Sequence, residues 1–138
     1  NTPRLDKAQK YISYAILIIA IVVLIFNYDK AYTALNCGYA IVLLSLQLFV
    51  VKGAYMGKFY RFYFWHLIPF FIVNGILTGT GIDQEVVWYN NTENLGIRMG
   101  TIPVEDSLYS LSLMLMNITI LEYLKSRFKK HNQIPIVA

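Results

Sequence analysis

Two adjacent carboxylic acids, Glu105 and Asp106, stand immediately before the apolar run of residues 107–123. Pro103 precedes them, and proline suits the first turn of a helix, where its missing N–H is not needed. The two acids would then lie in the first turn of that helix, near the positive end of its dipole. Because the run is long enough to enter a membrane, the pair is a candidate functional site. The alternative is that both acids cap a helix and face water.

A carboxyl pair in an apolar setting suits proton transfer. Desolvation favours the neutral form of a carboxyl group and a neighbouring carboxylate favours it further, whereas a helix N-terminus opposes these effects more weakly. In a dry site, one acid of the pair would therefore keep its proton near neutral pH. Such an acid can protonate a hydrocarbon double bond, and aromatic faces can stabilise the resulting carbocation as they do an ammonium ion.

Polar side chains also interrupt the apolar run 59–78. His66, Asn74 and Thr78 are spaced by multiples of four residues, so they fall along one side of a helix. Together with Tyr109, they are candidates for lining a substrate site. The alternative is that Asn74 and Thr78 form hydrogen bonds between helices, and that His66 is an ordinary buried histidine.

Several kinds of chemistry are excluded by missing residues. The sequence has no Gly-x-Gly-x-x-Gly and no P-loop motif, so it suggests no nucleotide site. Cys37 is its one cysteine, which excludes an internal disulfide and a thiolate metal site. The two histidines are far apart, His66 in an apolar run and His131 in the C-terminal tail, which argues against a histidine metal site. No lysine lies within an apolar run, so a retinal Schiff base is excluded. We expect no metal, no cofactor and no nucleic-acid partner.

The elements that must position these residues are membrane helices. The 138 residues are 57% hydrophobic and only 14% charged, whereas a soluble domain carries about a quarter charged residues. We therefore expect an all-α integral membrane helical bundle, formed as one domain by residues 1–138. Four apolar runs predict its transmembrane helices, at about 11–27, 32–51, 59–78 and 104–124.

A long connection, residues 79–102, precedes the last run. Long loops in compact proteins are often functional, and Trp88 and Tyr89 would anchor this one at the level of the lipid head groups. It could form a re-entrant or interfacial flap. If its Trp88–Tyr89 segment folds over the start of the last helix, the carboxyl pair is short of water and both aromatic residues could face a bound substrate. An ordinary solvent loop is the alternative.

The basic residues predict the topology. With four spans, ten of the 12 lysines and arginines fall on one side of the membrane, and only Lys30 and Arg98 fall on the other. The positive-inside rule then places both termini in the cytoplasm and the carboxyl pair at the outer face of the cell membrane. Omitting one span would destroy this segregation, so the charge pattern supports the count of four.

The ordered set of short motifs resembles the integral-membrane lycopene cyclases, the heterodimeric or fused carotenoid cyclases of bacteria, archaea and fungi. The motifs are Ile-Pro-Phe-Phe-Ile-Val-Asn-Gly-Ile-Leu-Thr-Gly at 68–79, Trp-Tyr at 88–89, Leu-Gly-Ile-Arg at 95–98 and Ile-Pro-Val-Glu-Asp at 102–106. Pro103, Glu105 and Asp106 match the family's Pro-x-Glu-(Glu/Asp) signature, with aspartate where many members have glutamate. The resemblance covers essentially the whole chain.

The resemblance implies cyclisation of the linear ψ-ends of lycopene, or a related acyclic carotenoid, to β-rings, without net redox change or a cofactor. It implies that Glu105 is the proton donor and Asp106 its electrostatic partner. The residues expected to contact substrate are His66, Asn74, Thr78, Trp88, Tyr89 and Tyr109. Family members are built from two related halves, and this chain resembles the second, so we expect a homologous half as a partner, upstream on the same polypeptide or as a separate subunit.

Two other functions remain open at this stage. The chain could be a non-enzymatic carotenoid-binding or assembly subunit whose partner half carries catalysis. It could also be half of a small transporter, although its helices carry few polar residues along their length.

Overall fold

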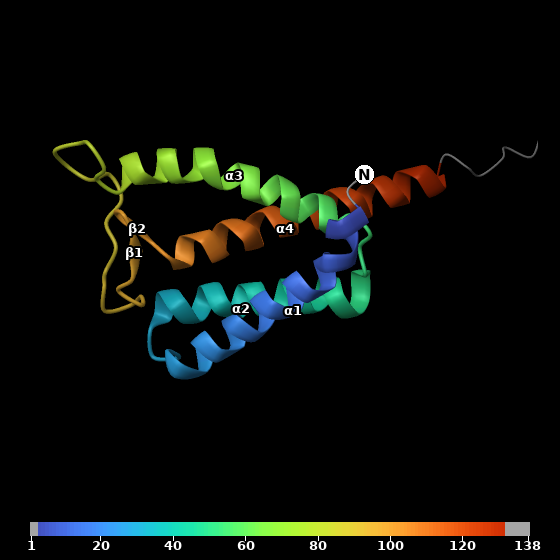
Figure 1. Cartoon of the computed structure of the whole chain (residues 1–138), viewed down its shortest axis with the longest axis horizontal. Helices are drawn as coiled ribbons and strands as arrows, with labels where there is room; N and C mark the ends of the chain where they lie inside the picture. The colour runs from blue at the N-terminus through green and yellow to red at the C-terminus, as the bar shows by residue number, and fades with distance from the viewer. Residues whose placement is uncertain (1–2, 132–138) are drawn as a thin grey trace, which may run out of the picture.

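The computed structural model describes residues 3–131, which form a bundle of four long helices (Figure 1). The elements are α1 (Pro3–Phe26), α2 (Ala31–Ser45), η1 (Leu46–Val51), α3 (Met56–Leu77), β1 (Arg98–Met99), β2 (Ile102–Pro103) and α4 (Glu105–His131). The all-α prediction is confirmed, with one short hairpin as the exception. Predictions for the two ends of the chain fall partly on residues 1–2 and 132–138, outside the described residues.

Three helices of the described residues are long and apolar enough to cross a membrane: Lys7–Phe26, Ala31–Val51 and Glu105–Lys129. The predicted run at 59–78 is also helical, as α3, and its 22 residues would suffice in length. The mean hydropathy of α3 is lower because its first half contains Lys58, Arg61 and His66 together with Tyr60, Tyr63 and Trp65. The structure therefore supports a membrane protein with three candidate spans.

The helices run alternately up and down. α1 packs against α2 and α3, and α2 packs against α4. Figure 1 shows the turn at 27–30 and the long loop before α4 at one end of the bundle. The start of α1, the loop at 52–55 and the last turns of α4 lie at the other end. The three basic segments of the sequence are therefore at one end of the molecule, as the charge pattern predicts.

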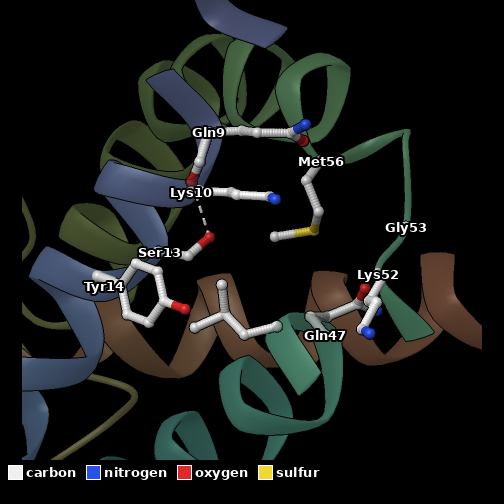
Figure 2. Close-up of a pocket in the computed structure, with 9 residues that line it drawn as sticks. Gln9, Lys10, Ser13, Tyr14, Gln47, Lys52, Gly53 and Met56 are labelled. Atoms are coloured by element: carbon white, nitrogen blue, oxygen red, sulfur yellow. Dashed lines mark hydrogen bonds between the residues drawn. The ribbon is translucent and has the colours of Figure 1, made fainter. Parts of the chain in front are cut away.

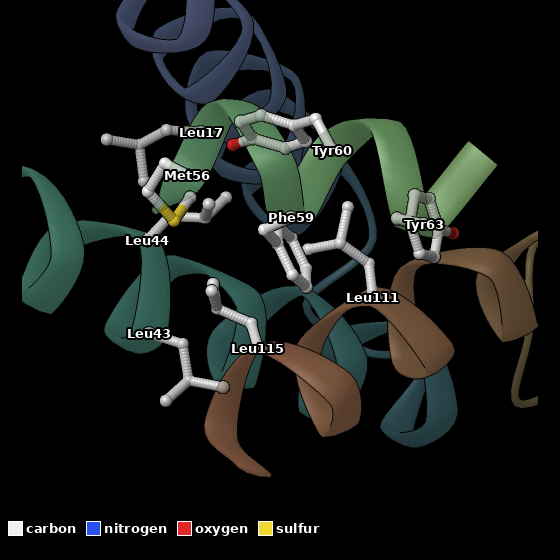
Figure 3. Close-up of a cluster of buried hydrophobic side chains, with 9 residues drawn as sticks. All are labelled: Leu17, Leu43, Leu44, Met56, Phe59, Tyr60, Tyr63, Leu111 and Leu115. Atoms are coloured by element: carbon white, nitrogen blue, oxygen red, sulfur yellow. The ribbon is translucent and has the colours of Figure 1, made fainter. Parts of the chain in front are cut away.

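Side chains from all four helices form the core (Figure 3). The buried cluster consists of Leu17, Leu43, Leu44, Met56, Phe59, Tyr60, Tyr63, Leu111 and Leu115. Tyr60 contributes its ring to this cluster while its hydroxyl group shares a hydrogen bond of 2.6 Å with Ser13 Oγ of α1. The aromatic residues of α3 thus join α3 to the other helices without leaving a buried hydroxyl group unpaired.

The boundaries differ most from the predicted ones at the start of α1 and at the end of α4. α1 begins at Pro3, well before residue 11, since proline is tolerated in the first turn of a helix. α4 continues to His131, beyond the predicted end at residue 124. Pro103 is not in the first turn of α4, so that prediction is wrong: it lies in β2, paired with Arg98 of β1.

The small hairpin explains the position of Pro103. Gly100 begins its two-residue turn with a φ of +66°, a conformation that suits glycine. Pairing of the hairpin holds residues 102–103 extended, and Val104 N donates to Ile97 O at 3.0 Å. α4 can begin only at Glu105, so the two acids still occupy its first turn, as predicted.

Candidate active site

The carboxyl pair is buried where the long loop meets the bundle. Only 4% of Glu105 and 3% of Asp106 is exposed, which excludes the alternative that the two acids face water. The side chains and backbone groups that surround them come from α2, α3 and the loop at 79–104. Burying a carboxyl group costs free energy unless hydrogen-bond partners compensate for it. The two acids differ in how many such partners they have.

Asp106 is surrounded by hydrogen-bond donors. Tyr32 of α2 donates its hydroxyl proton to Oδ1. Asn74 Nδ2 of α3 and the Tyr89 hydroxyl of the loop donate to Oδ2, at 2.8 and 2.7 Å. Both carboxyl oxygens therefore act as acceptors, and no neighbouring group requires a proton from Asp106. This is the hydrogen-bond pattern of an ionised carboxylate.

Glu105 has donors on only one side of its carboxyl group. Thr33 Oγ1 and the backbone N–H of Leu95 donate to Oε1, at 2.8 and 2.6 Å. Oε2 is buried and has no hydrogen-bond partner among the described residues. The first oxygen is thus fixed in place as an acceptor, while the second is available to carry a proton.

Glu105 also forms part of the wall of a cavity of about 280 Å³. The other lining residues come from α1, α2, α3, α4 and the loop, and nearly all are apolar: Ile16, Ile19, Ala20, Val23, Cys37, Tyr63, Leu95, Val104, Ser107, Leu108 and Leu111. Tyr63 donates its hydroxyl proton to Ser107 O at 2.6 Å, so its ring is held against the cavity. An acid at an apolar wall can protonate an apolar molecule, because no water competes for its proton.

The long loop contacts this end of the bundle through Glu93, Leu95 and Tyr89. Glu93 accepts hydrogen bonds from the first turn of α2: Tyr32 N and Thr33 N donate to its backbone oxygen, at 3.0 and 3.3 Å. Its carboxylate accepts from Ala31 N at 3.0 Å. The loop therefore fixes the start of α2, and with it the two residues that donate hydrogen bonds to the acids.

Tyr89 connects this loop to Asp106. Burial, together with the hydrogen bond to the Asp106 carboxylate, raises the pKa of the Tyr89 phenol to about 12. The guanidinium group of Arg98 lies 5.9 Å from the centre of the Tyr89 ring and has a smaller, opposite effect. Tyr89 therefore remains a hydrogen-bond donor to Asp106 throughout the neutral range.

The predicted substrate-contact residues divide into two groups. Asn74 and Tyr89 reach Asp106, as described above. Thr78 lies nearby but bonds to Thr101 Oγ1, at 2.7 Å. With Trp88 and Tyr89, Thr78 borders a separate surface hollow of about 450 Å³.

The remaining predicted residues do not reach the pair in this structure. Trp88 is 72% exposed and Tyr109 is 45% exposed. His66 Nε2 shares a hydrogen bond of 3.1 Å with Ser110 Oγ, one turn further along α4. Within residues 3–131, no group of three or more potential metal ligands comes together.

Sequence reasoning missed Tyr32, Thr33 and the backbone of Leu95. A signal for the first two was present, because the alternating topology places the start of the second apolar run at the same end as the carboxyl pair. Two hydroxyl groups at that position could have been assigned to the site. The approach of Leu95 N to Glu105 depends on the path of the loop, which has no comparable signal.

Comparison with known proteins gives a match to one family. A family model described as lycopene cyclase matches residues 29–124. No curated protein and no solved structure gives a match. The matched residues include both acids and every residue that donates a hydrogen bond to them. Because the match extends over more than half of the sequence, the chain belongs to the lycopene cyclase family.

Proposed function

We propose that this chain is one half of a carotenoid cyclase that closes the ψ-ends of lycopene into β-rings, with Glu105 as the proton donor. The observation that carries the proposal is Glu105 itself: it lines an apolar cavity, and its Oε2 is buried without a hydrogen-bond partner among the described residues, next to an Asp106 whose two oxygens both accept hydrogen bonds. We assign the two acids separate roles, Glu105 as the proton donor and Asp106 as its hydrogen-bonded electrostatic partner.

The reaction can be written with this one donor. Glu105 Oε2 gives its proton to C2 of the terminal C1=C2 double bond, which leaves a cation at C1. The C5=C6 double bond attacks C1, so that the C1–C6 bond forms and the cation moves to C5. Loss of the C6 proton to the Glu105 carboxylate restores a C5=C6 double bond and the neutral acid. No electrons are gained or lost overall, and no cofactor is consumed.

Asp106 has a positioning and electrostatic role in this scheme. In this proposal the negative charge of Asp106, the next residue after Glu105, favours the cationic intermediate through space, while Tyr32, Asn74 and Tyr89 fix its orientation. We assign Tyr63, whose aromatic side chain lines the cavity, to face the cation.

The test compares two variants in lycopene-accumulating cells that also express the first half of the enzyme. Glu105→Gln preserves the side-chain shape but cannot give a proton, so we expect a folded, inserted protein that accumulates lycopene. Asp106→Asn should be impaired as well. Glu122→Gln is the matched control, because Glu122 is an exposed acid of the same helix, paired with Lys125 at 3.0 Å.

An active Glu105→Gln variant would contradict the proposed role of Glu105. Normal β-ring formation by Glu105→Gln, at the protein level of the control, would remove Glu105 from the mechanism. It would favour the other candidate function, a carotenoid-binding or assembly subunit whose partner carries catalysis.

The need for a homologous partner half is part of the proposal. A cavity of about 280 Å³ encloses only an end of a long polyene, so further surface must hold the rest. The outer face of α3 is apolar and exposed, with Trp65, Ile68 and Ile72 each more than half accessible. We also infer that α3 spans the membrane with the other three helices. Pigment analysis with and without the first half tests the pairing, and full conversion by this chain alone would contradict it.

A further inference from the structure

A polar pocket, separate from the apolar cavity beside Glu105, lies at the end of the bundle opposite the carboxyl pair (Figure 2). It has a volume of about 250 Å³ and is enclosed by α1, η1, the loop at 52–55 and the first turn of α3. Its lining residues are Gln9, Lys10, Ser13, Tyr14, Gln47, Leu48, Lys52, Gly53 and Met56. None of them takes part in the chemistry proposed above.

The pocket is positively charged. Figure 2 shows Lys10 extending into it from α1, with Lys52 on the opposite side. Among the side chains that the structure describes, those of residues 7–129, no acidic one lines the pocket and neither lysine forms an ion pair. Two ammonium groups at one pocket, without an ion-pair partner among these described side chains, favour an anionic ligand.

Gln47 supplies an unused hydrogen-bond acceptor. It is 3% exposed, and its Nε2 donates to the Tyr55 hydroxyl at 2.6 Å and to Thr119 Oγ1. Thr119 gives its own proton to Leu115 O at 2.6 Å, so it must accept from the amide nitrogen. This fixes the orientation of the amide group and leaves Gln47 Oε1 buried without a partner.

Gln9 also has a side-chain oxygen without a hydrogen-bond partner: its Oε1 is buried and has no such partner among the described residues. A buried polar atom without a partner destabilises the fold by about 1–3 kcal/mol. Two such acceptors at one pocket therefore indicate a ligand that carries hydrogen-bond donors, in addition to its negative charge.

The backbone around Gln47 is unusual as well. η1 is a π-helical turn, a form that occurs frequently at functional sites. Its last hydrogen bond runs from Lys52 N to Gln47 O, at 2.8 Å, and Lys52 adopts a positive φ of 48°. Residues other than glycine rarely adopt a positive φ. At Lys52, this conformation directs the chain back over the pocket.

We propose that this pocket binds a phosphate ester bearing free hydroxyl groups, in the form of a lipid head group such as that of phosphatidylglycerol. Lys10 and Lys52 hold the phosphate, and the head-group hydroxyls donate to Gln47 Oε1 and Gln9 Oε1. A lipid is favoured because the apolar surface of α1 continues from the pocket, where Tyr14 and Ile18 are 42% and 59% exposed and can contact acyl chains.

The test uses the whole protein, purified in detergent, with bound lipid counted by native mass spectrometry. The probes are short-chain phosphatidylglycerol, phosphatidic acid and phosphatidylcholine, with soluble glycerol 3-phosphate as competitor. We expect phosphatidylglycerol to bind at least about tenfold more tightly than phosphatidylcholine, the effect of one charge-assisted hydrogen bond. Phosphatidic acid, which lacks head-group hydroxyls, should be intermediate.

Two sets of variants assign the effect to residues. Lys10→Ala with Lys52→Ala should abolish the preference for phosphatidylglycerol, whereas Lys7→Ala with Lys58→Ala removes the same charge outside the pocket and should preserve it. Gln9→Met should reduce only the preference for phosphatidylglycerol over phosphatidic acid. Equal binding of phosphatidylglycerol and phosphatidylcholine, or equal effects of the two lysine pairs, would overturn the proposal. Displacement of the lipid by an equal concentration of glycerol 3-phosphate would overturn its assignment to a lipid.

Discussion

Glu105 and Asp106 are neighbours in the chain, yet their side chains meet different surroundings. Successive residues of an α-helix point about 100° apart. In the first turn of α4, this rotation directs Glu105 toward the apolar cavity and Asp106 toward α3 and the loop. The two adjacent acids therefore lie in two different environments, whereas two acids on the same helix face would share one.

The Thr33 hydroxyl group fixes the acid that we assign as donor. Thr33→Val keeps the branched shape but removes the donor to Glu105 Oε1, which leaves only the Leu95 N–H. We expect about tenfold slower cyclisation, since a hydrogen bond to a charged or polar site contributes about 1–3 kcal/mol. Rates in membranes with matched protein levels measure this. Thr33→Ser, which restores the hydroxyl group, should recover most of the rate, and failure to do so would show that only packing was disturbed.

Tyr89 allows a test by pH. Its phenol has an ordinary pKa of 10.0, which the fold raises to about 12. A raised pKa in the folded state means that this contribution to stability is complete below pH 10 and is lost as the pH rises through about 12. The difference in tyrosinate absorbance between the protein and Tyr89→Phe should therefore show a midpoint near 12, and a midpoint at 10 would indicate that Tyr89 is not bonded to Asp106.

At the scale of elements, the long loop and the start of α2 stabilise each other. Helix N-termini have unpaired N–H groups, and the α2 cap residue, Lys30, provides no side-chain hydrogen bond. Glu93 takes this role from a distance, through both its backbone and its carboxylate. The donors Tyr32 and Thr33 are thus held in position by a residue that does not touch either acid.

Removing the Glu93 carboxylate should loosen that junction. Glu93→Ala deletes the hydrogen bond to Ala31 N, and loss of a helix cap costs about 0.5–2 kcal/mol. We expect faster hydrogen exchange of the amides at 31–34 and lower cyclase activity, because Thr33 is less well placed. Asp83→Ala, which removes an exposed acid of the same loop, is the control and should change neither. Equal exchange in the two variants would contradict the role of Glu93.

At the scale of the whole molecule, the up-and-down arrangement places the two polar sites at opposite ends of the bundle. If all four helices span the membrane, the positive-inside rule puts the basic end in the cytoplasm. Asn91→Cys should then react with a membrane-impermeant maleimide in intact cells, and Lys52→Cys only after permeabilisation. The native Cys37 is buried and gives little background. Labelling of both variants from outside would contradict the four-span topology.

The amino-acid sequence by itself determined the helical membrane architecture. A backbone in lipid must satisfy its own hydrogen bonds, so long apolar runs can form little other than helices. The four runs became four helices, and the distribution of basic residues followed their alternation. The Pro-x-Glu-Asp stretch also located the carboxyl pair in the first turn of α4, although Pro103 itself lies in the preceding hairpin.

Only the tertiary structure decided which acid is satisfied and which is left with a free oxygen. The groups that bond to the pair come from α2, α3 and two parts of the loop, and some are more than seventy residues from the acid they contact. Helical periodicity says which side of α4 an acid faces, but not what packs there. The exposed positions of Trp88 and Tyr109 have the same origin, because the path of an irregular loop and the rotation of a helix are set by packing between elements rather than by local sequence.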